Sequence, residues 1–413
     1  MLANELIIMA INKFIHIVSS PFSQRDYVRY GIDMLRADGF DVEVWNVGKL
    51  VNKYAYEKCA NVSRKFELEE VFNTKNEFLK RLRRIGPAFF FSAVPYHSSS
   101  LFLYRGLSSS AQTYSISVSY PLSAWVKAIG AGETKVLKQS KARFFERLKG
   151  ISFKKISYKV ISTVPLWLFG IRHADIVFSG GFQSSFLNPL IGLNTRVMNI
   201  HVNDYDIFLD NPQSEPCEEK YAVFIDQNLP LNTDPLYTKS TRVVTENNYF
   251  PSVTQFFNEI EKELGMPVKI AVHPRADYGS IPGLFGGREL LQGETARLVN
   301  GSSLVIAHYS YAVNFAVLYR KPLIFITTNE LKASFRRVAT EAISSHFDKD
   351  PINVDCNNEI DWKCEMTVDT RLYDQYIFNF IKQPGTPKRL FWQVVGERAK
   401  QLLGDIDKKT KLT

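Results

Sequence analysis

The sequence predicts an α/β protein of two domains, each built around a parallel β-sheet. Short apolar runs without polar alternation, such as residues 268–272, are typical of strands buried on both faces of a sheet. These runs alternate with stretches whose apolar residues recur at helical spacing, which is the pattern of parallel strands joined by crossover helices. The chain has 413 residues, more than one hydrophobic core usually fills, so two domains of about 200 residues each are expected.

The first half of the chain begins with a strand, a helix and a second strand. Apolar runs at 14–20 and 41–47 flank a stretch of helical spacing at 27–39, and Gly39 ends that helix. The elements expected next are a helix at 66–86 and strands at 88–95, 113–121 and 174–181. The last of these strands ends in two glycines, which allow a tight turn at the edge of the sheet. Residues 1–210 are therefore expected to form a Rossmann-like domain.

A second Rossmann-like domain is expected over residues 220–385, after a polar, proline-containing linker at 211–219. Its first strand ends at Asp226. The remaining expected elements are a helix at 251–265, a strand at 268–272, a helix that begins at 294–295, a strand at 304–307, a helix after residue 310, a strand at 323–327 and helical structure to about 345. A closing helix at 390–406 belongs to a final segment, 386–413.

Composition excludes several classes of protein. Hydrophobic residues make up 45% of the chain, which is typical of a globular protein with sizeable cores. The four cysteines show no paired spacing, so neither a disulfide framework nor a zinc site is expected. No apolar run reaches the roughly 20 residues of a membrane span, and the run at 6–11 is too short for a signal peptide. We therefore expect a cytoplasmic protein, at most peripheral on the inner face of the cytoplasmic membrane.

Positive charge is concentrated in one stretch of the first half. Between residues 135 and 159 the chain carries nine lysines and arginines and a single acidic residue, Glu146. Aromatic and aliphatic residues accompany this charge at 153–171. The composition is typical of attachment to an anionic membrane surface, and a solvated basic helix is the alternative interpretation. No nucleic-acid-binding motif accompanies the charge, so nucleic acid is not an expected partner.

Polar side chains follow two strands of the second domain at the point where each strand ends. The sequence HPR follows one strand at 273–275, and the sequence HYS follows another at 308–310. In open parallel sheets ligands bind beyond the carboxyl ends of the strands, where histidine and arginine can hold a phosphate through charge-assisted hydrogen bonds. Ser310 is also placed to cap the next helix, whose amino end would attract an anion. The pattern predicts one crevice for a phosphorylated ligand.

Two Rossmann-like halves with a phosphate crevice in the second half describe the GT-B architecture of glycosyltransferases. The HPR and HYS motifs resemble the paired motifs of bacterial sialyltransferases and Kdo transferases, which use CMP-activated sugars. The wider run, mainly residues 196–330, is similar to proteins of capsule and O-antigen assembly. The resemblance implies transfer of Kdo or a related nonulosonate from a CMP donor to a surface polysaccharide or a lipid-linked glycan, without a cofactor.

The resemblance also implies roles for individual residues of the second domain. His273 would contact or protonate the leaving phosphate, Ser310 would donate a hydrogen bond to it, and Arg275 would add a nearby charge. Glu294 and Thr295 would meet the ribose or the base of the donor.

The HYS motif leaves two points open. His308 is expected either to bind the donor or to be a hydrogen-bonded structural histidine. Tyr311 stands directly after the motif, at a position where the resembling enzymes often have a second small hydroxyl residue. One phosphate-binding hydroxyl is then missing.

Acidic residues are the candidates for chemistry at the anomeric carbon. The resemblance to retaining Kdo transferases matches Asp226 to their nucleophile, and Glu133, in a glycine-flanked loop, is the candidate for acid/base work across the cleft. An inverting route would instead use a single carboxylate as base. Asp204 and Asp206 imitate a metal-binding DxD motif, but their place just before the linker favours a structural role, so no metal is expected.

Two other functions stay open at the level of sequence. The same fold could use a UDP- or GDP-hexose as donor, or could epimerise a UDP-sugar. A degenerate transferase that serves as a scaffold in polysaccharide assembly is the non-catalytic alternative, and Tyr311 favours it.

Overall fold

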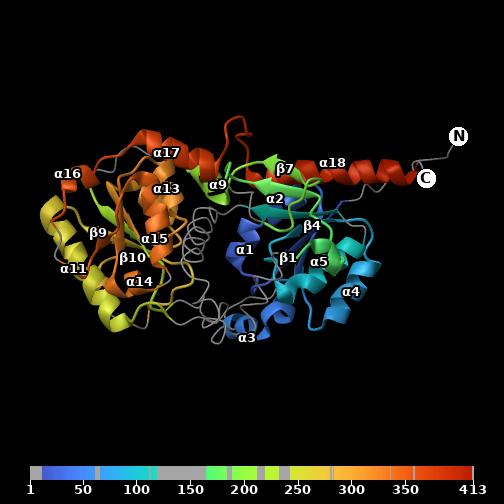
Figure 1. Ribbon diagram of the computed structural model, residues 1–413, viewed down its shortest axis with the longest axis horizontal. Helices are drawn as coiled ribbons and strands as arrows, with labels where there is room; N and C mark the ends of the chain where they lie inside the picture. The colour runs from blue at the N-terminus through green and yellow to red at the C-terminus, as the bar shows by residue number, and fades with distance from the viewer. Residues whose placement is uncertain are drawn as a thin grey trace, which may run out of the picture.

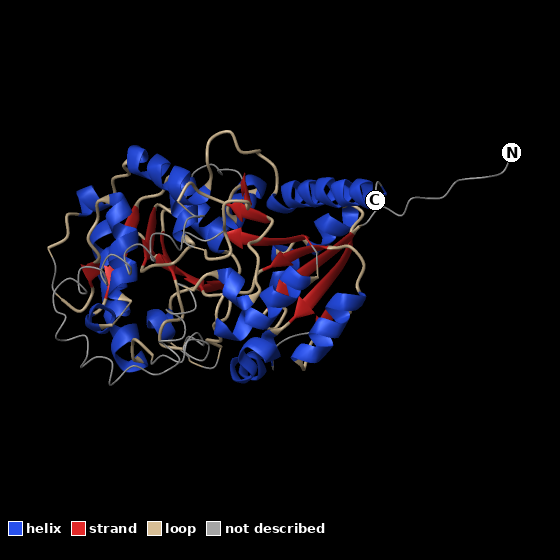
Figure 2. Cartoon of the chain, turned by 45° about the vertical axis from the view of Figure 1, so that its right-hand side comes forward, coloured by secondary structure: helices blue, strands red, loops and turns tan. Residues whose placement is uncertain are grey.

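The computed structural model describes residues 12–60, 66–110, 113–118, 164–183, 188–211, 219–231, 242–279, 281, 283–334, 336–356 and 359–411. Within these residues the chain forms one parallel sheet of 7 strands and another of 6 strands. Figure 1 shows the two halves side by side along the longest axis of the molecule. Figure 2 shows the strands of each half as a separate group surrounded by helices.

The first sheet has the strand order β3-β2-β1-β4-β5-β6-β7, and all its neighbouring pairs are parallel. Its strands are β1 (Lys13–Val18), β2 (Asp41–Asn46), β3 (Glu69–Val71), β4 (Phe89–Ser92), β5 (Thr113–Val118), β6 (Ile176–Ser179) and β7 (Arg196–Asn199). β4 and β6 are buried throughout because the chain covers both faces of the sheet. The strands predicted at 14–20, 41–47, 88–95, 113–121 and 174–181 are confirmed.

Two predictions for this half are wrong in detail. The helix predicted at 66–86 is edge strand β3 followed by α4 (Lys75–Arg84), because Thr74 and Glu77 form a capping box that starts the helix at Lys75. The strand at 174–181 is not the last of the sheet, since β7 lies beyond it at the edge.

The helix predicted at 27–39 is divided in two by Gly31. It consists of α1 (Gln24–Arg29) and α2 (Ile32–Ala37), and Gly31 between them has a φ of +58°. A Cβ atom at Gly31 would lie 2.2 Å from Cγ of Trp392, so the close approach of that indole also requires glycine.

Hydrophobic cores fill both faces of the first sheet. One contains Trp45 and Phe90 with side chains of α4 and of α5 (Leu101–Ser109). The other contains Phe14 and Phe91 with side chains of α2 and of α18 (Phe391–Lys411). The closing helix is therefore confirmed, and it packs on the first sheet although it ends the chain.

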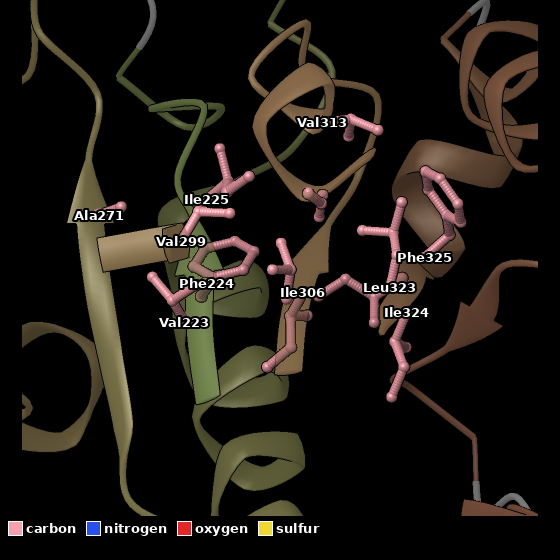
Figure 3. Close-up of a cluster of buried hydrophobic side chains, with 14 of the residues drawn as sticks. Val223, Phe224, Ile225, Ala271, Val299, Ile306, Val313, Leu323, Ile324 and Phe325 are labelled. Carbon is pink, nitrogen blue, oxygen red and sulfur yellow. The ribbon is translucent and has the colours of Figure 1, made fainter. Parts of the chain in front are cut away.

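The second sheet has the order β10-β9-β8-β11-β12-β13, again entirely parallel within the described residues. Its strands are β8 (Ala222–Ile225), β9 (Val268–Val272), β10 (Leu290–Gln292), β11 (Leu304–Ala307), β12 (Leu323–Thr327) and β13 (Ile352–Asn353). Figure 3 shows side chains of β8, β11 and β12 packed together with Val299 and Val313 from neighbouring helices. β10 and β13 were not predicted, because edge strands of 3 and 2 residues carry too little apolar sequence to be recognised.

Helices alternate with these strands. They include α11 (Glu246–Leu264), α12 (Thr295–Gly301), α13 (Val313–Leu318), α14 (Asn329–Ala333) and α15 (Arg337–Ser344), followed by α16 (Trp362–Glu365), α17 (Thr370–Tyr376) and a π-helical segment, η5 (Ile377–Ile381). α11 begins at Glu246 rather than at the predicted 251, and Gly265 ends it with a φ of +64°, as its place in the sequence predicted.

α9 (Asn203–Asp210) joins the two halves through two of its three carboxylates. Asp206 accepts hydrogen bonds from the backbone N–H of Phe391, at 2.9 and 3.1 Å, and so binds the amino end of α18. Asp204 accepts a hydrogen bond from Nδ2 of Asn314 in α13, at 2.8 Å. These contacts are the structural role predicted for both residues. Most of the predicted linker, 211–219, lies outside the described residues, and the domain boundaries stay predictions.

Candidate functional site

The candidate site lies where three adjacent strands of the second sheet end. β9, β8 and β11 are neighbours in the sheet and are followed by His273, Asp226 and His308 respectively. Because the strands are parallel, these residues stand on one edge of the sheet, which is where the sequence predicted a crevice.

Asp226 is almost entirely buried, and its carboxylate connects two of the loops. Oδ2 accepts hydrogen bonds from the backbone N–H of His273, at 3.1 Å, and from the hydroxyl of Tyr278, at 2.9 Å. Oδ1 accepts a hydrogen bond from the backbone N–H of Asn228, at 2.8 Å. Burial raises the pKa of Asp226, and these hydrogen bonds oppose the rise. The carboxylate therefore holds the loops after β8 and β9 together through these hydrogen bonds.

This geometry does not support the nucleophilic role expected for Asp226. Both of its oxygens already accept hydrogen bonds, and the residue is 3% exposed. Attack on an anomeric carbon would require the carboxylate to give up these donors and to reach the surface.

His273 is held in a defined turn with its ring at the surface edge of the site. Its Nδ1 accepts a hydrogen bond from the backbone N–H of Arg275, at 3.2 Å, so a neutral imidazole carries its proton on Nε2. Its carbonyl oxygen accepts a hydrogen bond from Nε2 of Gln292, at 3.2 Å, and the same amide donates to the carbonyl of Ala276 at 3.0 Å. The backbone of the HPR turn is therefore fixed, and the ring is oriented by the contact at Nδ1.

His308 is fully buried and connects three elements. Its Nδ1 lies 2.7 Å from the carbonyl oxygen of Ile326 in β12, and its Nε2 lies 2.9 Å from the hydroxyl of Tyr249 in α11. Burial lowers the pKa of His308 to about 4, so the ring is neutral at physiological pH. The structural alternative stated for this histidine fits these contacts, whereas donor binding by its side chain stays a prediction without support from this geometry.

The sequence predicted that Ser310 caps the helix that follows it, and this prediction is wrong. α13 begins at Val313, and the residue that precedes it, Ala312, makes no capping hydrogen bond through its side chain. The hydroxyl of Ser310 instead accepts a hydrogen bond from the backbone N–H of Ala312, at 3.2 Å, because the chain makes a turn before the helix begins. Ser310 is partly exposed in this turn.

The turn after β11 is tied to the loop after β8. The backbone N–H of Tyr309 donates a hydrogen bond to Oε1 of Gln227, at 3.0 Å. Together with the Asp226 contacts, this bond links the three strand-end loops into one network. Gln227, Tyr278 and Gln292 were missed in the sequence, since only the fold brings them beside the HPR and HYS turns.

The other predicted site residues lie at the edge of this network. Arg275 is exposed directly after His273, and Thr295 is partly exposed at the start of α12. Glu294 precedes α12 and forms an ion pair with Arg297, whose Nε lies 2.5 Å from Oε2. Glu133 lies outside the described residues.

A hollow of about 800 Å³ opens at the same edge of the sheet, and none of its described lining residues is a predicted site residue. Its lining includes Pro230 from the loop after β8, Thr245 at the amino end of α11 and Ser334 after α14. Glu330 closes one side, where its carboxylate accepts hydrogen bonds at 2.8 Å from the backbone N–H and the hydroxyl of Thr245. The hollow is large enough for a small-molecule ligand.

Two arginines of the first half, Arg25 and Arg29, interact electrostatically with Asp204 in α9. Burial raises the pKa of Asp204, while its hydrogen bond from Asn314 and the positive charges of Arg29 and Arg25 oppose the rise. The carbonyl oxygen of Arg29 also accepts a hydrogen bond from Nε1 of Trp392, at 2.7 Å. Nδ2 of Asn203 in α9 lies 3.5 Å from the same carbonyl oxygen, so α1 lies beside α9. The sequence offered no signal for this, because the two helices are far apart along the chain.

Among the described residues, no group of three or more histidine, cysteine, aspartate or glutamate side chains could hold a metal ion. No helix in the same part of the chain is long and apolar enough to cross a bilayer.

Comparison with known proteins shows the fold and nothing finer. No protein-family model matches the chain, and no curated protein sequence gives a significant match. A variant of the wall teichoic acid polymerase TagF is similar with a TM-score of 0.51 at 11% identity, over 96% of this chain and 90% of that chain. Another TagF structure gives 0.50 at 12% identity, over 97% and 90%. MurG from Acinetobacter baumannii gives 0.45 at 8% identity, over 94% and 99%.

The two parallel sheets, their flanking helices and the similarity to TagF define a two-domain α/β fold of the GT-B type. The fold class predicted from the sequence is therefore confirmed.

Proposed function

We propose that this protein is a GT-B glycosyltransferase that moves a sugar from a nucleotide-activated donor to a glycan acceptor. The observation that carries the proposal is the His273 turn. Asp226 and Gln292 fix its backbone, and the hydrogen bond from the backbone N–H of Arg275 to Nδ1 orients the ring at the carboxyl edge of the sheet, with the proton of a neutral imidazole on Nε2. A preorganised donor of this kind can stabilise the negative charge that develops on a leaving phosphate.

The donor's phosphate would lie between the turns after β9 and β11. In this arrangement Nε2 of His273 donates to a phosphate oxygen, Arg275 adds positive charge, and the partly exposed Ser310 supplies a hydroxyl. Glu294 and Thr295, at the start of α12, would face the ribose or the base.

We further propose a CMP-activated donor, with Kdo or a related nonulosonate as the sugar. This proposal rests on the resemblance of the HPR and HYS motifs to those of CMP-sugar transferases. The acceptor would be a bacterial surface polysaccharide or a lipid-linked glycan, reached from the cytoplasmic face of the membrane. The basic stretch at 135–159 supports contact with an anionic membrane surface.

For the stereochemical course, the contacts of Asp226 favour an inverting route over a covalent adduct. An inverting transferase needs one carboxylate to accept the proton of the acceptor hydroxyl, and Glu133 is the candidate that the sequence offers for this role. A retaining route through an Asp226 adduct would require the carboxylate to leave Tyr278 and His273.

Thermal melting with separate nucleotides tests the proposal. CMP or CDP is expected to raise the melting temperature, and UDP and GDP are expected to leave it unchanged. His273→Ala should abolish the increase, whereas His173→Ala, which replaces an exposed histidine of the first half, should keep it. Protection by UDP or GDP would favour a hexose transferase or an epimerase, and no response to any nucleotide would favour a scaffold.

A further inference from the structure

An apolar surface bordered by arginines lies at the amino edge of the first sheet. Its apolar side chains are Trp167, Leu168 and Leu193, which are 72%, 57% and 105% exposed. Trp167 and Leu168 belong to the 3-10 turn Leu166–Phe169, which precedes β6, and Leu193 belongs to the turn that precedes β7. We refer to these three residues, with Arg105 and Arg83, as the amino-edge surface.

The two turns are firmly anchored, so the exposure of their tips does not reflect loose packing. Leu166 and Leu190 are buried in the same core. The backbone N–H of Ile171 donates to the carbonyl of Leu166 at 3.1 Å, and that of Ala174 donates to the carbonyl of Leu190 at 2.9 Å. The fold thus keeps the side chains of Trp167 and Leu193 exposed to solvent, although burial of such side chains would stabilise the folded protein.

Positive charge borders the apolar tips. Arg105 in α5 is exposed, and its Nε lies 3.7 Å from the position of a Cβ atom built on Gly170, at the end of the Trp167 turn. The exposed Arg83, in the last turn of α4, lines a groove of about 420 Å³ between the carboxyl ends of α4 and α5. Arg172 also lies here, but it is paired with Asp175 at 2.7 Å.

We propose that the amino-edge surface docks on an anionic lipid bilayer. Tryptophan and leucine at the tips of rigid turns can enter the interface between headgroups and acyl chains, while the guanidinium groups beside them bind lipid phosphates. The charge of the surface is complementary to anionic lipid, and the nine basic residues at 135–159 precede the Trp167 turn directly in the sequence.

The docking surface is separate from the candidate site. The Trp167 and Leu193 turns precede β6 and β7, whereas the loop after β6, at Gly180 and Gly181, packs against Val202 and Asn379 at the junction of the two halves. Membrane docking at the amino edge therefore leaves the carboxyl edges of both sheets accessible. The proposal does not depend on which reaction the protein catalyses.

Co-sedimentation of the full chain with vesicles tests the proposal. Binding is expected to vesicles that contain phosphatidylglycerol, to be absent with pure phosphatidylcholine, and to weaken as salt is raised. Replacing both Trp167 and Leu168 by serine should lower the partition coefficient about tenfold or more, because most of the inserted apolar area is lost. Arg105→Glu should also lower it. Tyr54→Ser, which removes an exposed aromatic ring from the segment after β2, is the matched control and should bind as the unaltered protein does.

Quenching of tryptophan fluorescence by brominated lipids distinguishes insertion of Trp167 into the bilayer from binding by charge alone. Quenching of tryptophan fluorescence should disappear in Trp167→Phe. Unchanged vesicle binding by the double serine variant would overturn the proposal, even if the basic stretch still attracts the protein to lipid. Self-association that the same double variant abolishes, with no vesicle binding by the unaltered chain, would assign the surface to a second copy and would also overturn it.

Discussion

The carboxylate of Asp226 accepts a hydrogen bond from the backbone N–H of His273 at 3.1 Å, across the ends of two adjacent strands. The same oxygen accepts a hydrogen bond from the hydroxyl of Tyr278, and the other accepts one from the backbone N–H of Asn228. A residue chosen from the sequence as a nucleophile is thus one that holds the candidate phosphate-binding turn in place. Its removal has consequences for stability as well as for the site.

Replacing Asp226 by alanine should destabilise the protein strongly. The change leaves three buried donors without their acceptor, each of which costs roughly 1 kcal/mol or more, so the free energy of unfolding in urea should fall by about 3 kcal/mol. Tyr278→Phe removes one of these donors and should cost only about 1 kcal/mol. Equal stability of Asp226→Ala and the unaltered protein would show that the carboxylate does not stabilise the loops.

Asp226 also allows the inverting route to be distinguished from the retaining route. If Asp226 only positions the turn, protein incubated with the sugar donor alone should show no added sugar mass on the peptide that spans 221–230. Mass spectrometry of the digested protein measures this directly. A sugar adduct on that peptide would restore the nucleophile and show that the loops rearrange when the donor binds.

His273→Ala should lower the rate of sugar transfer by about two to three orders of magnitude, because it removes a donor to the charge of the leaving phosphate. The backbone contacts of the turn use the main-chain N–H and C=O of residue 273, so the melting temperature should change little. Steady-state kinetics with the donor identified by thermal melting checks the rate. Near-normal turnover would remove His273 from the site.

Chelators should have little effect on transfer. Asp204 and Asp206, which resemble a metal-binding motif, already bind Asn314 and Phe391. Turnover should therefore be similar in EDTA and in millimolar Mg²⁺. A strict requirement for a divalent ion would contradict this expectation and would call for a ligand set that includes residues beyond those described.

His16 should make the protein less stable in acid. It lies in the core between the first sheet and α18, among Phe14, Phe91 and Trp392, and neither of its ring nitrogens has a hydrogen-bond partner among the described residues. Burial lowers its pKa to about 3, from 6.5 in an unfolded chain. The unfolded chain therefore binds the additional proton below pH 6.5, and the stability contributed by neutral His16 is lost as the pH falls from 6.5 towards 3.

The variant His16→Phe isolates this effect from the other titrating groups. Its free energy of unfolding should match or exceed that of the unaltered protein at pH 7, because two unpaired nitrogens are replaced by an apolar ring edge. The difference should then grow by about 1.4 kcal/mol for each pH unit below 6.5. Urea denaturation at several pH values measures it, and a difference independent of pH would contradict the assignment.

Gly181 should be intolerant of any side chain. A Cβ atom there would lie 2.1 Å from the carbonyl oxygen of Asn379, where η5 crosses the end of β6. The clash is with backbone atoms, which can shift only at a high energetic cost. Gly181→Ala should therefore lower the free energy of unfolding by about 1–3 kcal/mol and should loosen the junction between the halves. Gly86→Ala, where nothing lies within 4 Å, is the control and should be nearly neutral. Calorimetric melting compares the two.

The local pattern of the sequence was enough to predict most of the fold. Buried strands such as β8, β9, β11 and β12 appear as uninterrupted apolar runs because both of their faces are covered, and their alternation with helical stretches indicates parallel sheets. The same reasoning predicted that His273, Asp226 and His308 stand on one edge of the sheet, since parallel strands end on one edge. Edge strands β10 and β13 were not predicted, because few of their residues are buried.

Only the tertiary structure decided which groups surround the candidate site residues. The sequence placed Asp226, His308 and Ser310 after strands, but it did not show that Asp226 would be enclosed by Tyr278, or that His308 would be buried between α11 and β12. Several of the hydrogen-bond partners come from segments 18 to 82 residues away along the chain, such as Gln227 beside Tyr309. A side chain's chemistry depends on these neighbours, whereas its place in a strand or a turn depends on the residues next to it.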